Sequence, residues 1–319
     1  PDAVCCVVGT CASGFTENTG GDVIYTCDDI VTCKAGSKVQ YFWEAFPAGA
    51  GPTHRTTYMF TYIEPHPQRP SLLQMLEDYW QLMPAYQQLE GLDQLEVERV
   101  MFGLLPSWKD SPLEPGCDRV LQIGDASGIQ SPLSFGGFGA LTRHLPRVSG
   151  AVKEALDVGA LAREDLALIN AYNPGLNTAW LFQVSMSVKV GTSCEASFIN
   201  RLMGSTFAAM EQLGKPTMMP FLQDVVQFRG LVLTLAMVMA KNPSAVPEIL
   251  AKLGPGPLLE WLPNLSALGL YALAVGLVEG NQELVAEWQA ERSPLQQWRW
   301  RRRVESWKYG AGLDYSLSE

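Results

Sequence analysis

A stretch between residues 119 and 139 has the residue types to hold a ring-shaped ligand against the backbone. The apolar run at 119–123 predicts a buried strand, and the turn Gly-Asp-Ala-Ser-Gly at 124–128 follows it. That turn places one short carboxylate, Asp125, beyond the carboxyl end of the strand, where open α/β sheets bind ligands. Pro132 and the glycines after it predict a helix start whose bare amides and positive dipole end favour negative charge. The pattern therefore predicts a site for a flat, anionic ring.

The same stretch resembles the second fingerprint of flavoproteins of the glutathione-reductase type, in particular the geranylgeranyl reductase and lycopene cyclase group. In that group a G-D-A-x-G or G-D-A-x-H box supplies an Asp to the ribityl chain, and a following P-x-x-G-x-G presents amides to the pyrimidine edge of the isoalloxazine. The resemblance implies FAD as the cofactor, although the spacing after the proline is one residue longer here. The alternative is a Gly-rich strand-turn-helix with no role in cofactor binding. The implied cofactor-binding residues are Gly124, Asp125, Ala126, Pro132, Gly136 and Gly137.

An aromatic motif at 41–51, Tyr-Phe-Trp-Glu-Ala-Phe-Pro-Ala-Gly-Ala-Gly, supplies a second pattern. It resembles the Y-x-W-x-F-P signature that lines the substrate cavity in geranylgeranyl reductases, with one extra residue before Phe-Pro. In a strand, Tyr41 and Trp43 share one face while Phe46 lies on the other. The resemblance implies a cavity for an apolar polyene, lined by Tyr41, Trp43, Phe46 and Pro47. The alternative is aromatic packing in an ordinary core.

Two carboxylates near this motif bear on a cyclase activity. Lycopene cyclases look similar and carry an E-E-T motif in this strand pair, whose carboxylate is thought to protonate the polyene. This chain has Tyr-Met-Phe-Thr-Tyr at 58–62 instead, with Glu64 at the strand end and Glu44 on the preceding strand. Either could be a displaced acid, but an exposed carboxylate at a strand end is far more often solvated, and this is the expectation for both. Reductase chemistry, in which the flavin carries the hydride, is therefore favoured over cyclisation.

A dinucleotide-binding unit is missing from the sequence. Flavoproteins of this type open with a strand, G-x-G-x-x-G, a helix and an acidic residue about twenty positions later. The nearest glycine cluster, Gly-Thr-Cys-Ala-Ser-Gly at 9–14, lacks that spacing and leads into a polar, turn-rich stretch. We therefore expect this chain to be the carboxyl-terminal part of a longer polypeptide whose adenosine-binding half lies upstream.

Composition predicts a folded protein of one or two domains, since 47% of the 319 residues are apolar and 18% are charged. The net charge of −10 argues against nucleic acid as a partner, because phosphate binding needs a basic surface. The seven cysteines include no Cys-x2-Cys pair, so we expect free thiols in a reducing compartment and no metal site. His144 lies on the helix after the glycine-rich turn, where it could face the cofactor region, although a position on the helix surface is the commoner case.

Alternating and helical apolar patterns predict an α+β protein with an antiparallel substrate-domain sheet, the flavin-binding strand-turn-helix and a helical carboxyl-terminal layer. We expect residues 1–113 to form the sheet with a covering helix, 114–150 the flavin-binding segment and 151–319 the helical domain. The predicted strands are Asp22–Cys27, Lys38–Phe46, Arg55–Ile63 and Leu95–Leu105. The predicted helices are Ser71–Tyr86, Asn177–Lys189, Ser197–Leu213, Phe221–Lys241, Val246–Leu253, Leu262–Val278 and Leu295–Lys308.

Two segments raise the question of membrane contact. The apolar run at 262–278 is marginal in length for a bilayer span. It predicts a buried core helix or, alternatively, a helix surface that dips into lipid. The segment Trp298–Tyr309 is rich in tryptophan and arginine. We expect it either to contact an anionic membrane surface peripherally or to dock on the acidic body of its own protein.

With the resemblance, these patterns imply an FAD-dependent oxidoreductase-like protein that acts on a lipophilic isoprenoid or carotenoid-type molecule in a plastid. This chain would then be a fragment that lacks the ADP-binding half. Two alternatives stay open, a non-catalytic binding or assembly protein and a non-redox isomerase similar to lycopene cyclases.

Overall fold

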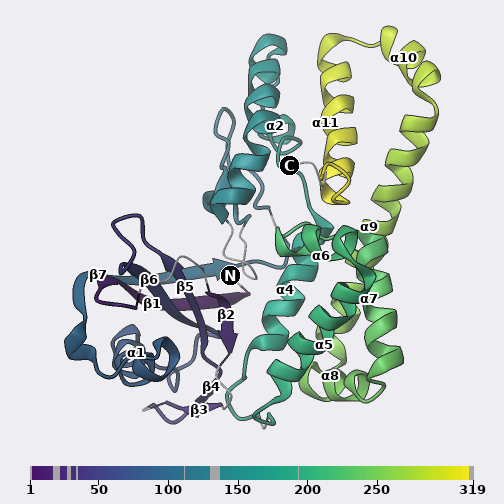
Figure 1. Cartoon of the computed structure of the whole chain (residues 1–319). Coiled ribbons are helices and arrows are strands. Elements are labelled where there is room, and N and C mark those ends of the chain that lie inside the picture. Colours follow the sequence, from purple (N-terminus) through teal and green to yellow (C-terminus); the bar gives the residue numbers. More distant parts are fainter. Residues whose placement is uncertain are drawn as a thin grey trace. The chain divides into compact units, whose positions relative to one another are not determined.

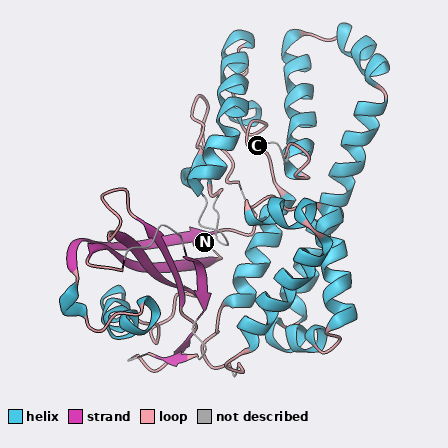
Figure 2. Ribbon diagram, viewed as in Figure 1, coloured by secondary structure: helices cyan, strands magenta, loops and turns pink. Residues whose placement is uncertain are grey.

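A computed structural model describes residues 2–16, 22–26, 30–33, 35–110, 112–129, 137–192 and 194–315. The chain divides into two units, Pro1–Ser107 with Val184–Leu202, and Trp108–Gln183 with Met203–Glu319. Strands lie in the first unit and helices dominate the second, which confirms the predicted α+β class (Figures 1 and 2).

An antiparallel sheet forms the first unit, with its strands in the order β2-β5-β6-β1-β7. The predicted strand Arg55–Ile63 is confirmed to the residue, because its alternating side chains match the two faces of the sheet. The predicted strand Lys38–Phe46 is interrupted at Gln40 and Tyr41, where the Gln40 side chain donates to the Tyr41 carbonyl at 3.2 Å. The strands of the sheet are β1 (Ala3–Ser13), β2 (Asp22–Thr26), β5 (Phe42–Pro47), β6 (Arg55–Ile63) and β7 (Glu96–Ser107), and a separate pair consists of β3 (Val31–Thr32) and β4 (Lys38–Val39).

Helix α1 (Leu72–Gln87) packs on one face of this sheet, as its apolar spacing predicts. Ser71 begins the helix with a capping box, which satisfies the first free N–H groups. On the covered face, the rings of Tyr79 and Trp43 are stacked with their centroids 5.3 Å apart. The helix side of the sheet is therefore a closed core. A short 3-10 helix, η1 (Leu92–Gln94), lies between α1 and β7 in the chain.

The segment Val184–Leu202 is tied to the sheet by buried polar contacts. The Arg69 side chain, only 4% exposed, donates to the Glu64 carboxylate and to the carbonyl of Val188. The other Glu64 oxygen accepts from the backbone N–H of Val190 at 2.9 Å. Burial opposes ionisation, but the Val190 N–H and Arg69 outweigh it and hold the pKa of Glu64 below its ordinary value. The expectation that Glu64 is merely solvated is therefore wrong.

The second unit is built from helices, and α4 and α5 also extend into the range 184–202 (Figure 1). The predicted helix Phe221–Lys241 is divided in two, because the chain turns at Asp224 (φ 57°) and buries Val225 and Val226 there. Helix α10 was not predicted. The helices are η2 (Gly124–Ser127), α2 (Gly137–Val158), α3 (Arg163–Leu166), α4 (Pro174–Met186), α5 (Phe198–Leu213), α6 (Lys215–Leu222), α7 (Phe228–Lys241), α8 (Ala245–Leu253), α9 (Pro255–Gly280), α10 (Gln282–Ala290) and α11 (Pro294–Gly310).

Helix α11, which carries the basic and aromatic segment, docks on its own unit against α9 and α2. Trp298 is fully buried in a cluster with alanines of α2. Ion pairs between its basic side chains and acidic groups also hold the helix in place. Docking on the protein's own body is one of the two arrangements expected from the sequence. A membrane contact through Trp298–Tyr309 stays a prediction. The ion pairs are Arg299–Asp165, Arg301–Glu154, Arg302–Glu154 and Lys308–Glu279.

Helix α9 departs from the prediction of a buried core helix. Trp261, Leu268 and Val275 are its buried residues, seven positions apart, so one narrow side of the helix faces the unit. Five of its leucines are exposed, and its other apolar side chains are half-buried. Within the described part of the chain, α9 is the one helix whose length and composition would allow it to cross a membrane.

Candidate functional site

The face of the sheet opposite α1 carries a cluster of aromatic rings around one carboxyl group. Strands β5 and β6 pair Phe42 with Phe60 and Glu44 with Tyr58, so these four side chains share one face. The rings of Phe42 and Phe60 stack at 5.3 Å, and the Tyr62 ring lies 5.6 Å from Phe42 and 5.8 Å from Phe60. We call this surface the aromatic face.

Glu44 is the titratable group at the centre of this face. The residue is 4% exposed, and its Oε2 atom has no hydrogen-bond partner among the described residues. Burial favours the neutral form, which raises the pKa of Glu44 to about 7. The expectation that Glu44 is solvated is therefore wrong, because the aromatic neighbours exclude water from it.

Tyr58 lies over Gly9, its partner on β1, and this position depends on the missing side chain. A Cβ atom on Gly9 would lie 2.6 Å from Tyr58 Cδ1 and 2.4 Å from the carbonyl oxygen of Thr57. The pKa of the Tyr58 hydroxyl is raised by burial and, further, by the nearby Glu44 and Cys11. Gly9 therefore makes room for a ring that sits beside the buried carboxyl.

The aromatic face has the properties of a site for an apolar molecule that exchanges a proton. A carboxyl with a pKa near neutrality is populated in both protonation states, as general acids and bases require. The rings beside it offer apolar surface and faces that attract positive charge. Phe42, Phe60 and Tyr62 are themselves only 1% to 2% exposed, so a lipophilic molecule would reach these rings only if the covering side chains moved aside, and Glu44 is the group that could then exchange a proton with it.

The residues predicted to line a substrate cavity are divided between the two faces of the sheet. Tyr41 and Trp43 are fully buried under α1, where the Tyr41 hydroxyl donates to Asp78 at 2.6 Å. Phe46 shares the aromatic face with Glu44, and its ring lies 5.7 Å from that of Tyr58. Pro47 is exposed at the strand end. The structure therefore brings Phe46, but not Tyr41 or Trp43, to the carboxyl.

The predicted strand before the Gly-Asp turn is wrong. Residues 119–123 form no strand, and Val120 and Ile123 are 52% and 45% exposed. A strand needs a partner for its backbone groups, whereas the N–H of Arg119 donates to the Leu161 carbonyl. In this unit Leu121 packs instead against the helical cluster that contains Ala151, Ala155 and Trp298.

The turn itself is formed, as the 3-10 helix η2 between two left-handed glycines. Gly124 has φ +56° and Gly128 has φ +75°, values that residues with a side chain rarely adopt. The Ser127 hydroxyl donates to the Gly124 carbonyl at 2.7 Å, which holds the turn closed. The two glycines are therefore required by the backbone.

Asp125 and Ala126 are exposed at the tip of this turn, and the Asp125 carboxylate is available to a ligand. Gly137 is the first residue of α2. Pro132 and Gly136, the other predicted cofactor residues, lie outside the described residues. The part of the site that the structure describes is thus an exposed carboxylate on a closed turn.

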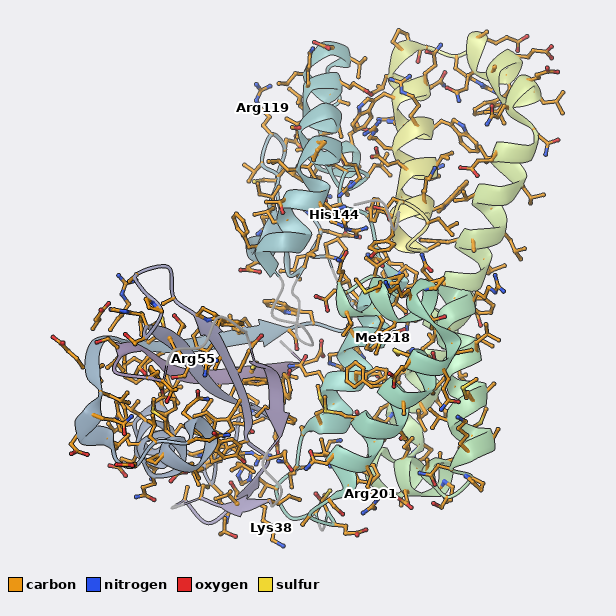
Figure 3. The ribbon with its side chains drawn as sticks, in the orientation of Figure 1. Lys38, Arg55, Arg119, His144, Arg201 and Met218 are labelled. Atoms are coloured by element: carbon orange, nitrogen blue, oxygen red, sulfur yellow. The ribbon has the colours of Figure 1, made fainter. Side chains whose placement is uncertain are left out.

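A cavity of about 50 Å³ lies next to the turn, between Gly124 and the helices α2 and α11. His144 lines it, half-buried, with its ring 5.8 Å from that of Tyr309 (Figure 3). Burial, and then Arg143 and Arg147, lower the pKa of His144 to about 4, so its imidazole is neutral at pH 7. The expectation of a surface histidine is wrong. The part of the cavity that the described residues enclose has room for about three to five water molecules.

Comparison with known proteins leaves the family open. No protein-family model and no curated protein match the chain. A crystal structure of the halogenase PltM in complex with ethyl mercury and mercury is similar to it at a TM-score of 0.42 and 11% sequence identity. The similarity covers 92% of this chain and 61% of the halogenase chain, so this chain spans less than two thirds of that protein's length. We draw no functional conclusion from this similarity.

One pattern in the sequence points to Glu44. Phe42, Glu44 and Phe46 alternate along a single strand, which puts a charged residue between two aromatic side chains on one face. An acid in that position is either at an open edge or buried. Glu44 is buried, because β5 pairs with β6, which places Tyr58 and Phe60 on the same face.

Proposed function

We propose that this chain is part of an FAD-dependent oxidoreductase-like protein that acts on a lipophilic isoprenoid or carotenoid-type molecule, with the ADP-binding half supplied by a further segment. The observation that carries the proposal is the Gly-Asp-Ala-Ser-Gly turn. Its backbone is fixed by Gly124 and Gly128, and it presents the Asp125 carboxylate to solvent. A plastid location, implied by the sequence resemblance, belongs to the same proposal.

The described residues fit part of a flavin site. Asp125 would accept a hydrogen bond from a ribityl hydroxyl, since it is an exposed acceptor on a rigid turn. Gly137, at the first turn of α2, would leave its backbone open to the ring. When bound, the flavin supplies hydride or electron transfer.

The aromatic face supports the lipophilic substrate class. Phe42, Phe60 and Tyr62 give contiguous apolar contact, and Glu44 Oε2 is the polar atom that such a substrate would meet. A double-bond reduction consumes one hydride and one proton. In this proposal Glu44 holds that proton at its carboxyl, and it takes up the next one when the product leaves and water reaches the site.

A second candidate is a non-catalytic binding or assembly protein, and a specific observation favours it. Val120, Ile123 and Phe138 are exposed around the Gly-Asp turn, the last at 81%, and apolar groups gathered in this way are typical of protein contacts. A third candidate, a non-redox isomerase similar to lycopene cyclases, draws on the same buried acid, Glu44.

The test is a titration with FAD, followed by visible absorbance and flavin fluorescence. Wild type, Asp125→Ala and Asp125→Asn are compared, both as this chain and as a form extended upstream. Asp93→Ala is the matched control, since Asp93 is also an exposed acid in the first turn of a 3-10 helix. We expect Asp125→Ala to weaken FAD retention about tenfold, the loss of one charge-assisted hydrogen bond.

The control and the two forms of the chain separate the candidates. Asp93→Ala should retain FAD as wild type does, and Asp125→Asn should retain an intermediate amount. Flavin bands in the extended form alone would support the view that this chain is one part of a larger flavin site. No flavin in either form would move the conclusion to the binding or assembly protein.

A further inference from the structure

The carboxyl-terminal half of the second unit exposes a row of leucines on α9 that is interrupted by Ser266. Between Glu260 and Glu279 the sequence has 18 residues without a charge, which is about 27 Å of helix. Successive leucines on the outer side of this stretch follow a helical repeat and are 49% to 68% exposed. We call them the leucine stripe: Leu259, Leu262, Leu270, Leu273 and Leu277.

The charges that border the stripe are neutralised within the unit. Glu260 pairs with Lys109 at 3.0 Å, and Glu279 pairs with Lys308 at 3.1 Å. Both acids thus have a cation of the same chain beside them, and the surface between them is electrically neutral. A neutral, apolar surface of this kind is suited to contact with lipid that carries no net charge.

Two polar side chains of this stretch, Asn264 and Ser266, are satisfied by the helix itself. Asn264 donates to the Glu260 carbonyl and Ser266 donates to the Leu262 carbonyl, both at 3.0 Å. Bonding to the carbonyl one turn earlier is how serine and asparagine are accommodated where water is scarce. A protein partner would instead use polar groups and aromatic anchors at its interface, and the stripe offers leucine.

We propose that the leucine stripe of α9 docks on the surface of a net-neutral lipid membrane, with the helix lying in the plane of the interface. The opposite side of α9 packs on the unit through Trp261, Leu268 and Val275, so the helix contacts lipid on one side and does not span the bilayer. Exposed Glu283 and Glu287 at the end of the stripe disfavour an anionic headgroup surface. The proposal is independent of flavin binding.

The experiment is flotation of the protein with phosphatidylcholine vesicles. Leu270→Glu/Leu273→Glu places two charges in the stripe, and Leu270→Ser/Leu273→Ser removes apolar area without adding charge. Leu73→Glu is the matched control, because Leu73 is 65% exposed on α1, a helix of the other unit. Helical circular dichroism and thermal unfolding are recorded for each variant.

Wild type and Leu73→Glu should float with the vesicles. Both double variants should bind the vesicles at least about tenfold more weakly than wild type. Adding phosphatidylglycerol should not strengthen the binding of wild type. Equal flotation of wild type and both double variants would overturn the proposal. Binding that requires phosphatidylglycerol would also overturn it. The same holds if wild type binds no vesicle and light scattering shows that it forms a dimer which Leu270→Glu/Leu273→Glu breaks.

Discussion

Glu44 and Tyr58 lie directly opposite each other on β5 and β6, and Gly9 on the next strand leaves space for the Tyr58 ring. This row places an unpartnered carboxyl oxygen beside a phenol in an environment that raises the pKa of both groups. Because Oε2 has no hydrogen-bond partner among the described residues, ionisation of the buried Glu44 carboxyl costs stability.

Glu44→Gln should change the pH dependence of stability. The folded state holds the Glu44 proton up to about pH 7, whereas the ordinary pKa is 4.5, so wild-type stability falls as pH rises between these values. At pH 8 the variant should be more stable than wild type by about 3 kcal/mol, the free energy of that pKa difference. Urea unfolding at pH 4.5 and pH 8 measures it, with Glu90→Gln as an exposed control. A variant that is less stable than wild type at pH 8 would contradict the buried, unpaired carboxyl.

Gly128→Ala should destabilise the turn that carries Asp125. Gly128 has φ +75°, and a Cβ atom there would lie 3.2 Å from Leu113 Cγ and from Trp108 Cε3. We expect a loss of about 1–2 kcal/mol from the left-handed backbone. Gly139→Ala is the control, since a Cβ atom at Gly139 meets no neighbour within 4 Å and alanine favours the helix by about 1 kcal/mol. Thermal unfolding of the two variants should shift in opposite directions, and parallel shifts would count against the turn geometry.

The elements that the sequence predicts well are those specified by local pattern. Strand β6 follows from its content of β-branched and aromatic residues and α1 from its apolar spacing, and both are in place. The run at 119–123 has the same apolar character, but strand formation depends on a pairing partner elsewhere in the fold, which local pattern does not contain. The burial of Glu44 is non-local in the same way, because it is set by Phe60 and Tyr62 from a different strand.

Arg69→Met should release the segment Val184–Leu202 from the sheet. Arg69 is almost completely buried and joins Glu64 to the Val188 carbonyl. Its loss leaves the Glu64 charge and a buried carbonyl without their donor, which should cost about 3 kcal/mol. Urea unfolding measures the loss, and limited proteolysis should cut within 184–202. Arg163→Met, which removes an exposed ion pair with Glu164, should leave both measurements unchanged. Equal proteolysis of the two variants would argue against the tie.

His144 should make the protein sensitive to acid. Burial and the neighbours Arg143 and Arg147 lower its pKa in the folded state to about 4, against 6.5 ordinarily. Below about pH 6.5, His144 therefore becomes protonated in the unfolded chain but stays neutral in the folded protein. The free energy of unfolding falls as the pH drops towards 4. His144→Gln should flatten this fall, whereas His66→Gln, at an exposed histidine, should keep it. Thermal unfolding from pH 4 to pH 7.5 gives the dependence, and NMR titration of the imidazole carbon-bound protons gives the pKa directly. A His144 midpoint above pH 6 would show that the two arginines and the buried setting do not act on the ring as the structure indicates.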